Sequence, residues 1–354
     1  MRAHMIRRVL SGTAAVATIL GLAACADSAS AGAPTPSTSS APVLPGANSL
    51  QADYVQTVRA VLPSVVLIRT SHDLGSGIVF DAKGDIVTND HVVGSATSFQ
   101  VTPSGTAQTL RATLVGRYPP DDLAVIRVSD PSGLKPAVFA DSSQVAVGEI
   151  VLAIGNPLGL TGSVTNGIVS AVGRTVTEPE GTDSPGATLA DAIQTSAAIN
   201  PGNSGGALVN LGDQVIGIPT LAATDQQGGG AAPGIGFAIS SNIVKDIASQ
   251  LVAHGKVTNS HRAALGIRAT TVTGRNGRPG GVGIVSVQPG GPAAAAGLTA
   301  GEIIVEVNGT ATPTASDLTA ALANLSPGQK ATVKVQRSDG STASVSVTLG
   351  TLPG

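Results

Sequence analysis

The sequence predicts a mainly β protein made of two six-stranded barrels and a second, smaller β domain. Of the 354 residues, 42% are hydrophobic but only 2% are aromatic, so we expect a core of aliphatic side chains. The 45 glycines and 22 prolines indicate many turns between short strands. About twelve short apolar runs, broken near 141–148, fit two barrels of six strands each.

The first 52 residues are predicted to be a processing signal and a tether. A basic start precedes an apolar run that is too short for a convincing membrane span. The run ends at Leu22-Ala23-Ala24-Cys25, which resembles the bacterial lipobox. We therefore expect removal of 1–24 and acylation of Cys25, the sole cysteine, with a buried structural cysteine as the alternative. Residues 25–52 are rich in Ser, Ala, Thr and Pro and are expected to form a flexible tether. Because of the signal and the acylated Cys25, the protein is predicted to be exported and lipid-anchored on the extracytoplasmic side of the cell membrane.

A first folded domain is expected at 53–257. A short amphipathic helix begins near Tyr54 and ends before Pro63. Apolar positions at helical spacing predict a second helix over Ser241–His254, capped by Ser240 or Ser241. Between these helices lie the predicted strands Val65–Arg69, Gly77–Phe80, Asp85–Thr88, Ser98–Thr102, Leu110–Val115, Leu123–Val128, Ile150–Ile154, Val164–Val172, Ala190–Gln194, Ala207–Val209, Gln214–Pro219 and Ile235–Ile239.

A second domain is expected at 262–354, after a polar break at Thr258-Asn259-Ser260. Its length of roughly ninety residues suits an independent domain. One helix is predicted at Ala315–Leu325, with Ser316 and Asp317 as its N-terminal cap. The predicted strands are Leu265–Ala269, Gly283–Val287, Ile303–Val307, Ala331–Arg337 and Ser344–Leu349.

The motif Gly202-Asn203-Ser204-Gly205-Gly206 places a serine among three glycines just before an apolar strand. Glycines allow a sharp turn with positive φ, in which backbone N–H groups converge on one point. An oxyanion would form at that point if the Ser204 hydroxyl attacked a carbonyl carbon. Because Asn, Ser and Gly are also common in hairpin turns, the motif alone leaves a nucleophile and a polar turn as equal alternatives.

A serine nucleophile needs a base and an acid that orients the base, and the chain offers a candidate for each. His91 follows a predicted strand and has apolar neighbours, where a packed histidine is the ordinary alternative. Asp121 and Asp122 precede an apolar strand, and Asp122 adjoins it directly, so it is the better candidate for burial against the imidazole; polarity at a strand end is the alternative. The order His91, Asp122, Ser204 is that of the two-barrel serine proteases, with the serine in the second half, and this agreement favours the catalytic interpretation.

Further motifs make the chain similar to the HtrA (Deg-type) serine proteases that carry a C-terminal PDZ domain. The resemblance covers roughly 53–354 and implies a chymotrypsin-like double six-stranded β barrel followed by a PDZ domain. It implies that His91 is the general base, that Asp122 orients it and that Ser204 is the nucleophile. It also implies an oxyanion hole made at Gly202, Asn203 and Ser204, with the N–H groups of the first and third as donors. The motifs are Gly75-Ser76-Gly77-Ile78, Ala153-Ile154-Gly155-Asn156-Pro157-Leu158-Gly159, Thr165-Asn166-Gly167-Ile168-Val169-Ser170 and Gly234-Ile235-Gly236-Phe237-Ala238-Ile239.

The resemblance implies an endopeptidase of protein quality control, which cleaves unfolded or damaged proteins through an acyl-enzyme and needs no cofactor or metal. Together with the lipobox-like sequence at Cys25, it predicts a membrane-anchored extracytoplasmic enzyme. None of the expected pocket residues is charged, so cleavage after small or medium aliphatic residues is predicted. A catalytically resting chaperone or adaptor that binds unfolded chains through the same groove is the alternative, and an esterase is disfavoured because no strand–elbow–helix context surrounds the serine. The expected pocket residues are Ile199, Asn200, Pro201, Ile218, Pro219, Thr220 and Leu221.

Three positions depart from the pattern of this family. Relatives usually carry Asp at the position of Ser196, Asn at that of Asp90 and Asn at that of Pro219, whose missing N–H removes one possible donor to a substrate strand. These departures bear on subsite binding and activation, and they leave the three catalytic candidates unchanged.

The second domain is expected to bind peptides. Ala264-Leu265-Gly266-Ile267 resembles the PDZ loop whose backbone N–H groups hold a terminal carboxylate while the peptide adds a strand at the sheet edge; a purely structural small barrel is the alternative. The expected partners are therefore unfolded proteins, C-terminal peptides and the membrane through Cys25, with a homotrimer as a further implication of the family. A net charge of -2 gives no electrostatic basis for binding nucleic acid.

Overall fold

The computed structural model describes residues 45–71, 73–156, 162–178, 187–200, 202–224, 231–274 and 277–353, which belong to one compact unit. The predicted signal at 1–24, Cys25 and the tether as far as 44 lie outside the described residues. No helix in the described part of the chain has the length and apolar character needed to cross a membrane.

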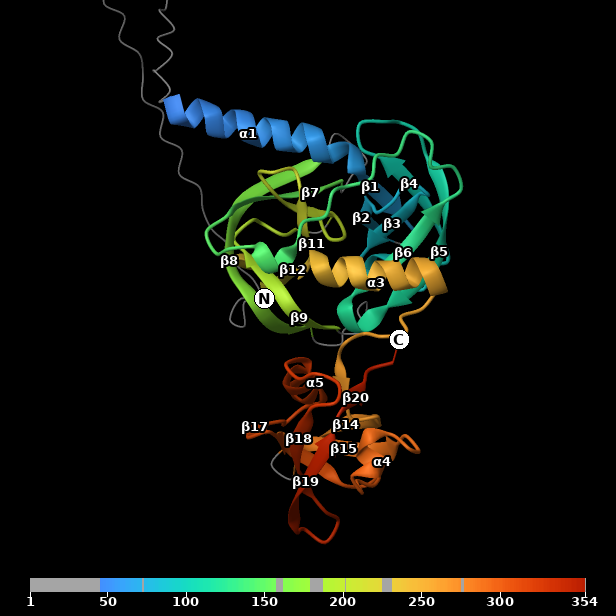
Figure 1. The fold of residues 1–354 in the computed structure, drawn as a ribbon, viewed down its shortest axis with the longest axis vertical. Coiled ribbons are helices and arrows are strands. Elements are labelled where there is room, and N and C mark those ends of the chain that lie inside the picture. Colours follow the sequence, from blue (N-terminus) through green and yellow to red (C-terminus); the bar gives the residue numbers. More distant parts are fainter. Residues whose placement is uncertain are drawn as a thin grey trace, which may run out of the picture. The chain divides into compact units, whose positions relative to one another are not determined.

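The first barrel is a closed antiparallel sheet with the strand order β1-β2-β3-β6-β5-β4 (Figure 1). Its interior is filled by aliphatic side chains such as Ile68, Ile86 and Ile126, as the composition predicts. The one-turn helix α2 (Asp90–Val93) follows β3, and the 3₁₀ turn η2 (Pro119–Asp121) precedes β6. The strands are β1 (Val65–Arg69), β2 (Leu74–Val79), β3 (Asp85–Thr88), β4 (Ser98–Pro103), β5 (Leu110–Tyr118) and β6 (Leu123–Val128).

The second barrel is also closed, in the order β10-β11-β12-β9-β8-β7. It follows the 3₁₀ turn η3 (Ser142–Gln144), which lies at the predicted break between the barrels. The prediction of two six-stranded barrels is therefore confirmed. The strands are β7 (Ile150–Gly155), β8 (Ser163–Glu178), β9 (Ala187–Thr195), β10 (Ala207–Asn210), β11 (Val215–Thr224) and β12 (Ala231–Ser240).

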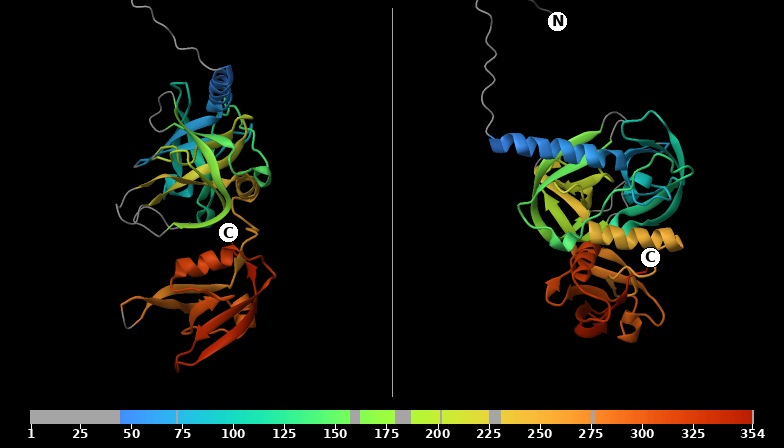
Figure 2. Two further views of the ribbon diagram at one scale, coloured as in Figure 1. Left: turned by 90° about the vertical axis from the view of Figure 1, so that its left-hand side faces the viewer. Right: turned by 45° about the horizontal axis from the view of Figure 1, so that its top comes forward.

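Two longer helices accompany the barrels (Figure 2). Helix α3 (Ser241–His254), which spans the predicted residues, packs on β5 and β6 of the first barrel and on β11 and β12 of the second. Helix α1 (Pro45–Val61) leads through the short 3₁₀ turn η1 (Leu62–Ser64) into β1. It begins earlier than the predicted start at Tyr54, so 45–52, expected in the tether, are helical; Leu, Gln and Ala in this stretch are good helix formers.

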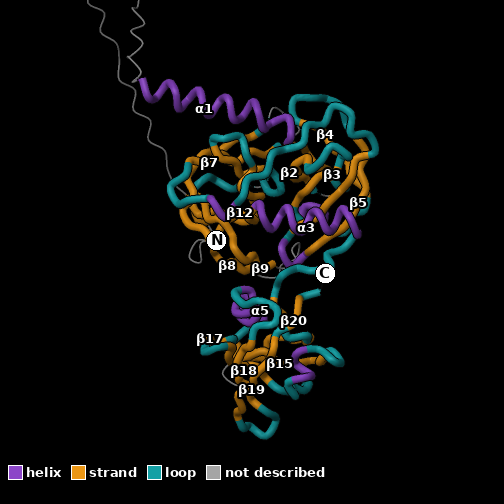
Figure 3. The backbone as a smooth tube through the Cα atoms, in the orientation of Figure 1, coloured by secondary structure: helices purple, strands orange, loops and turns teal. Residues whose placement is uncertain are grey.

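The second domain has a five-strand sheet path, β14-β15-β16-β18-β19, with β17 on β16 and a separate pair β13-β20. Figure 3 shows the strands of this domain in orange and its helix α5 in purple. Its first long strand starts at Ile267 and not at the predicted Leu265, because Gly266 adopts a φ of 69° that interrupts an extended strand. Thr314, not the predicted Ser316, caps α5 in a reciprocal capping box with Asp317. The elements are β13 (Ala263–Ala264), β14 (Ile267–Thr273), β15 (Pro279–Val287), α4 (Pro292–Ala295), β16 (Ile303–Val307), β17 (Thr310–Ala311), α5 (Ala315–Ala323), β18 (Lys330–Gln336), β19 (Thr342–Thr348) and β20 (Gly350–Thr351).

Candidate active site

The Ser204 loop is a tight turn held from within by the Asn203 side chain. The Asn203 N–H donates to Asn200 O over 3.1 Å, while the Asn203 amide group accepts from Asn200 N and donates to Ala198 O. Gly202 has a φ of 104°, in the region that favours glycine. Among the described residues, the backbone N–H groups of Gly202 and Ser204 have no hydrogen-bond acceptor, so both remain available as donors.

The two glycines after Ser204 are required by close backbone approach. A Cβ atom at Gly205 would overlap the carbonyl oxygen of Ser76, and one at Gly206 would overlap that of Ile154. The Ser76 hydroxyl donates to Gly202 O and accepts from Asn156 N, while Ser76 N donates to Ser204 O. A strand of the first barrel thus fixes the serine loop of the second.

His91 is presented by the single turn of α2, between the buried side chains of Asp90 and Val92. Its Nδ1 lies 2.8 Å from Asp122 Oδ2, and its backbone N–H donates to Asp122 Oδ1 over 3.0 Å. The imidazole is 27% exposed and the carboxylate 5% exposed, so the ring remains partly accessible while the carboxylate is shielded from solvent.

Asp122 has an unusual backbone conformation that turns its carboxylate toward His91. Its φ of 50° and ψ of 45° lie in the left-handed region, which is costly for a residue other than glycine. The Asp122 carbonyl accepts from Asn89 Nδ2 and from Asp90 N, at 3.0 and 3.1 Å. These bonds from the His91 turn hold the conformation in place.

Thr220 contacts both Asp122 and Ser204. Its hydroxyl donates to Asp122 Oδ2, and its backbone carbonyl accepts from Ser204 Oγ at 3.3 Å. The structure therefore brings His91, Asp122 and Ser204 into one hydrogen-bonded cluster across the two barrels. Sequence analysis predicts Thr220 only as a residue of the substrate pocket. Its hydrogen bond to Asp122 could not be predicted, because the two residues are far apart in the chain and no local sequence pattern relates them.

Asp90, one of the three departures, is completely buried beside His91. Its two carboxylate oxygens accept from Arg117 Nε and Nη2 of β5, at 2.5 and 2.8 Å. This fork is the geometry in which an arginine and a carboxylate bind most strongly. The bond to Asp90 raises the pKa of Arg117, and the pair anchors α2 to the barrel wall.

The neighbouring acid, Asp121, is paired with an arginine. Its Oδ1 accepts from Arg262 Nη1 at 2.5 Å, and the same nitrogen donates to Pro120 O. Burial raises the pKa of Asp121 to about 6, against the opposing effect of Arg262. Of the adjacent acids, Asp122 is therefore the one bonded to His91, as the strand position predicts.

The other expected pocket residues have mixed surroundings. Ile199 and Ile218 are buried, and the carbonyl of Pro219 accepts from Gly205 N at 3.0 Å. Ser196, at another departure, accepts from Ile168 N through its hydroxyl. Pro201 and the side chain of Leu221 lie outside the described residues.

In the described part of the chain, no three His, Cys, Asp or Glu side chains gather as a metal site.

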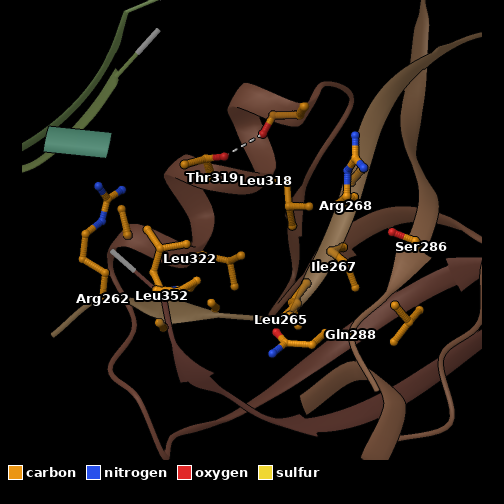
Figure 4. A pocket seen from close by; sticks show the side chains of 18 of the residues that line it. Arg262, Leu265, Ile267, Arg268, Ser286, Gln288, Leu318, Thr319, Leu322 and Leu352 are labelled. Carbon is orange, nitrogen blue, oxygen red and sulfur yellow. Dashed lines mark hydrogen bonds between the residues drawn. The ribbon is translucent and has the colours of Figure 1, made fainter. Parts of the chain in front are cut away.

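The second domain contains a groove of about 530 Å³ between β14 and α5. The predicted loop residues Ala264, Leu265, Gly266 and Ile267 line it, and Figure 4 shows Leu265 and Ile267 opposite Leu322 of α5. The Gly266 φ of 69° turns the chain at the head of β14. Within the described ranges, the N–H groups of Leu265 and Gly266 have no acceptor, an arrangement that suits an anion.

Comparison with known proteins agrees with both parts of this architecture. The trypsin-like peptidase domain family matches residues 75–218, and the PDZ domain family matches residues 263–349. Serine protease PepD of Mycobacterium tuberculosis is 40% identical over 329 residues, which cover 88% of this chain and 69% of PepD. Periplasmic serine endoprotease DegP of Escherichia coli is 41% identical over 284 residues, covering 78% of this chain and 56% of DegP.

A solved structure described as the HtrA-type protease AlgW with decapeptide has a TM-score of 0.56 and 30% identity, covering 85% of this chain and 99% of that one. The order of the two matched domains and the long alignment with PepD agree with this structural likeness. The chain belongs to the HtrA-type serine proteases that carry a PDZ domain.

Proposed function

We propose that this chain hydrolyses peptide bonds through a triad of His91, Asp122 and Ser204. The observation that carries the proposal is that the three residues converge on shared contacts: Asp122 bonds His91 directly, while the Thr220 hydroxyl donates to Asp122 and the Thr220 carbonyl accepts from Ser204 Oγ. All three lie within the match to the trypsin-like peptidase family, which supports the assignment.

In the proposed mechanism, Ser204 Oγ attacks the scissile carbonyl carbon and its proton passes to His91 Nε2. The C–N bond then breaks, the leaving amine takes that proton, and water releases the acyl group by the same steps. Asp122 accepts from the Nδ1–H of His91 and so fixes the tautomer in which Nε2 can take a proton. The carboxylate also stabilises the imidazolium that forms.

The proposed oxyanion hole consists of the backbone N–H groups of Gly202 and Ser204, with Asn203 between them. Two observations support it: neither N–H has an acceptor among the described residues, and Asn203 holds the turn through its own amide. Donors that are fixed before reaction contribute strongly to stabilising a developing oxyanion.

We propose that the substrates are unfolded or damaged proteins, cleaved after small or medium aliphatic residues beside the uncharged pocket residues 199–201 and 218–221. The name of DegP describes a periplasmic endoprotease, which supports a quality-control role on the extracytoplasmic side. The lipobox-like Leu22-Ala23-Ala24-Cys25 supports a lipid anchor. We assign the protease domain to 53–257, with α1 extending its start.

The PDZ domain, assigned to 262–354, is proposed to bind the C-termini of proteins. The acceptor-free N–H groups of Leu265 and Gly266 at the head of an apolar groove support this proposal. A terminal carboxylate would accept from these donors while the peptide adds a strand along β14.

The test is digestion of unfolded casein by the full-length protein in detergent, compared with Ser204→Ala and with Ser98→Ala, an exposed serine on β4. Native protein and Ser98→Ala are expected to cleave casein equally, and Ser204→Ala is expected to be inactive. Equal cleavage by Ser204→Ala would contradict the proposal. No cleavage by any of them, together with suppressed casein aggregation, would favour the chaperone alternative. Strong selection for Arg or Lys before the cleaved bond would contradict the pocket assignment.

A further inference from the structure

The PDZ groove has a free strand edge with a defined direction. Strand β14 is the first strand of its sheet path and pairs there only with β15 among the described strands. The loop with the acceptor-free N–H groups of Leu265 and Gly266 precedes β14. A peptide held there by its terminal carboxylate must therefore run antiparallel to β14, with its last residue beside the start of the strand.

The charged side chains of the groove are both arginines. Arg262 and Arg268 line it, and no Asp or Glu is among its described lining residues. The remaining lining is mainly apolar, with Ile267, Leu318 and Leu322 central to it (Figure 4). An apolar terminal side chain fits this lining, and a negative charge near it would meet no repulsion from the groove.

Only one of the two arginines is free to meet a ligand. The Arg262 side chain is 9% exposed and its guanidinium bonds Asp121 and Pro120 O. Arg268 is exposed and forms no ion pair within the described part of the chain. Figure 4 shows Arg268 beside Ser286, its cross-strand partner on β15, and on the other side of the groove from Arg262.

Strand alternation fixes which ligand side chains can reach Arg268. Ile267 and Ala269 are half-buried, whereas Arg268 between them is exposed, so Arg268 points to the other face of β14. If the last side chain of the bound peptide packs with Ile267, it lies on the Ile267 face of the sheet. Successive side chains of the peptide strand alternate between the two faces, so those one and three residues before its C-terminus lie on the same face as Arg268.

We propose that this PDZ groove selects C-termini with an apolar last residue and an acidic residue one or three positions before it, and that Arg268 recognises the acidic side chain. This inference rests on the proposed peptide-binding function of the domain. Arg268 acts here as a specificity-determining residue: the apolar groove and backbone donors supply general affinity, and the guanidinium distinguishes acidic from neutral ligands.

The test uses fluorescence anisotropy with the full-length protein in detergent and labelled ten-residue peptides that end in valine. One carries Glu at both positions, two carry it at a single position, and the others carry Gln or Lys at both. The Glu-to-Gln change is expected to weaken binding about three- to tenfold, as for a charge-assisted pair at a partly exposed site, and the effect is expected to shrink at high salt. Arg268→Glu is expected to reverse the order so that the Lys peptide binds best. Lys330→Glu, an exposed charge reversal in the same domain, should keep the native order.

Equal binding of the Glu and Gln peptides by the native protein, or an unchanged order in Arg268→Glu, would overturn the role of Arg268 while leaving peptide binding intact. A Glu peptide with an amidated C-terminus tests carboxylate binding separately from recognition by Arg268. If the amidated peptide binds as tightly as the free acid, or if no peptide binds, the proposed carboxylate-binding function fails and the inference fails with it.

Discussion

At the scale of single residues, the site is organised around the Asp122 carboxylate. It accepts from the His91 backbone N–H, interacts with the His91 ring and accepts from the Thr220 hydroxyl. Hydrogen bonds to a charged group are stronger than neutral ones, and three of them fix the carboxylate plane. These bonds hold the imidazole in one orientation, as the proposed role of His91 as a general base requires.

Replacing Thr220 tests this orienting role. Thr220→Val keeps the shape but removes the donor to Asp122, a loss of roughly 1.5–3 kcal/mol for a bond to a charged group. We expect kcat/KM for a peptide substrate to fall about ten- to a hundredfold, mainly through kcat, while Thr220→Ser retains most activity. Equal activity of the Val and Ser variants would show that the hydroxyl has no orienting role.

The Asp90–Arg117 pair predicts an effect on stability. Asp90→Asn removes the charge that Arg117 binds and leaves a partly exposed guanidinium with a weaker partner. We expect the free energy of unfolding in urea to fall by roughly 1–3 kcal/mol, whereas Asp53→Asn on the exposed face of α1 should change little. Adding Arg117→Gln to Asp90→Asn should recover part of the loss; a purely additive double variant would contradict the coupling.

At the scale of elements, strand β2 and the serine loop meet across the barrel boundary. The Ser76 hydroxyl and backbone make three bonds there: to Gly202 O, from Asn156 N and to Ser204 O. The glycine at 205 allows this contact, because its φ of 79° and the adjoining Ser76 carbonyl exclude a side chain. The position of Ser204, the proposed nucleophile, therefore depends on a strand of the other barrel.

Gly205→Ala is expected to disturb the loop by this close approach. Gly105→Ala is the matched control, because Gly105 also has a φ of 79° but has open space where a Cβ would lie. Both variants carry the left-handed strain of roughly 1–2 kcal/mol, and only Gly205→Ala adds the overlap. We expect Gly205→Ala to lose nearly all peptidase activity and Gly105→Ala to keep it; similar activities would contradict the steric argument.

The elements themselves were largely predictable, whereas the links between them were not. Short apolar runs between turn residues predict the twelve barrel strands, and helical spacing predicts α3, because these signals are local. Thr220 and Ser76 act through bonds to residues in another barrel, and no local pattern encodes such partners. The one-turn helix α2 is likewise too short to show helical periodicity.

At the scale of the whole molecule, the two barrels share an apolar core. Leu123 of the first barrel, Leu152 and Ile218 of the second and Leu251 of α3 belong to one buried cluster. Burial of this shared surface fixes the barrels relative to each other. A site with His91 and Asp122 in one barrel and Ser204 in the other depends on this packing, in addition to the bonds that Ser76 and Thr220 make between the barrels.

Asp121 predicts how stability depends on pH. Its folded pKa of about 6 lies above the ordinary 3.8, mainly through burial, with Arg262 and Asp246 as the charged groups that act on it. The folded state therefore holds the proton more tightly, so this contribution is present below about pH 4 and is lost as the pH rises through about 6. In urea unfolding between these values, Asp121→Asn should gain stability relative to the native protein as the pH rises. A difference that does not vary with pH would contradict the raised pKa.

The proposed triad is tested by covalent labelling with a fluorophosphonate, with the labelled residue identified by mass spectrometry of the digested protein and the labelling rate measured. If His91, Asp122 and Ser204 act as one unit, a single adduct forms on Ser204, and His91→Ala lowers its rate by roughly three or more powers of ten. Asp122→Asn should also slow labelling strongly, whereas Asp53→Asn should not. Labelling of another serine, or labelling of Ser204 at an unchanged rate in His91→Ala, would contradict the proposed triad.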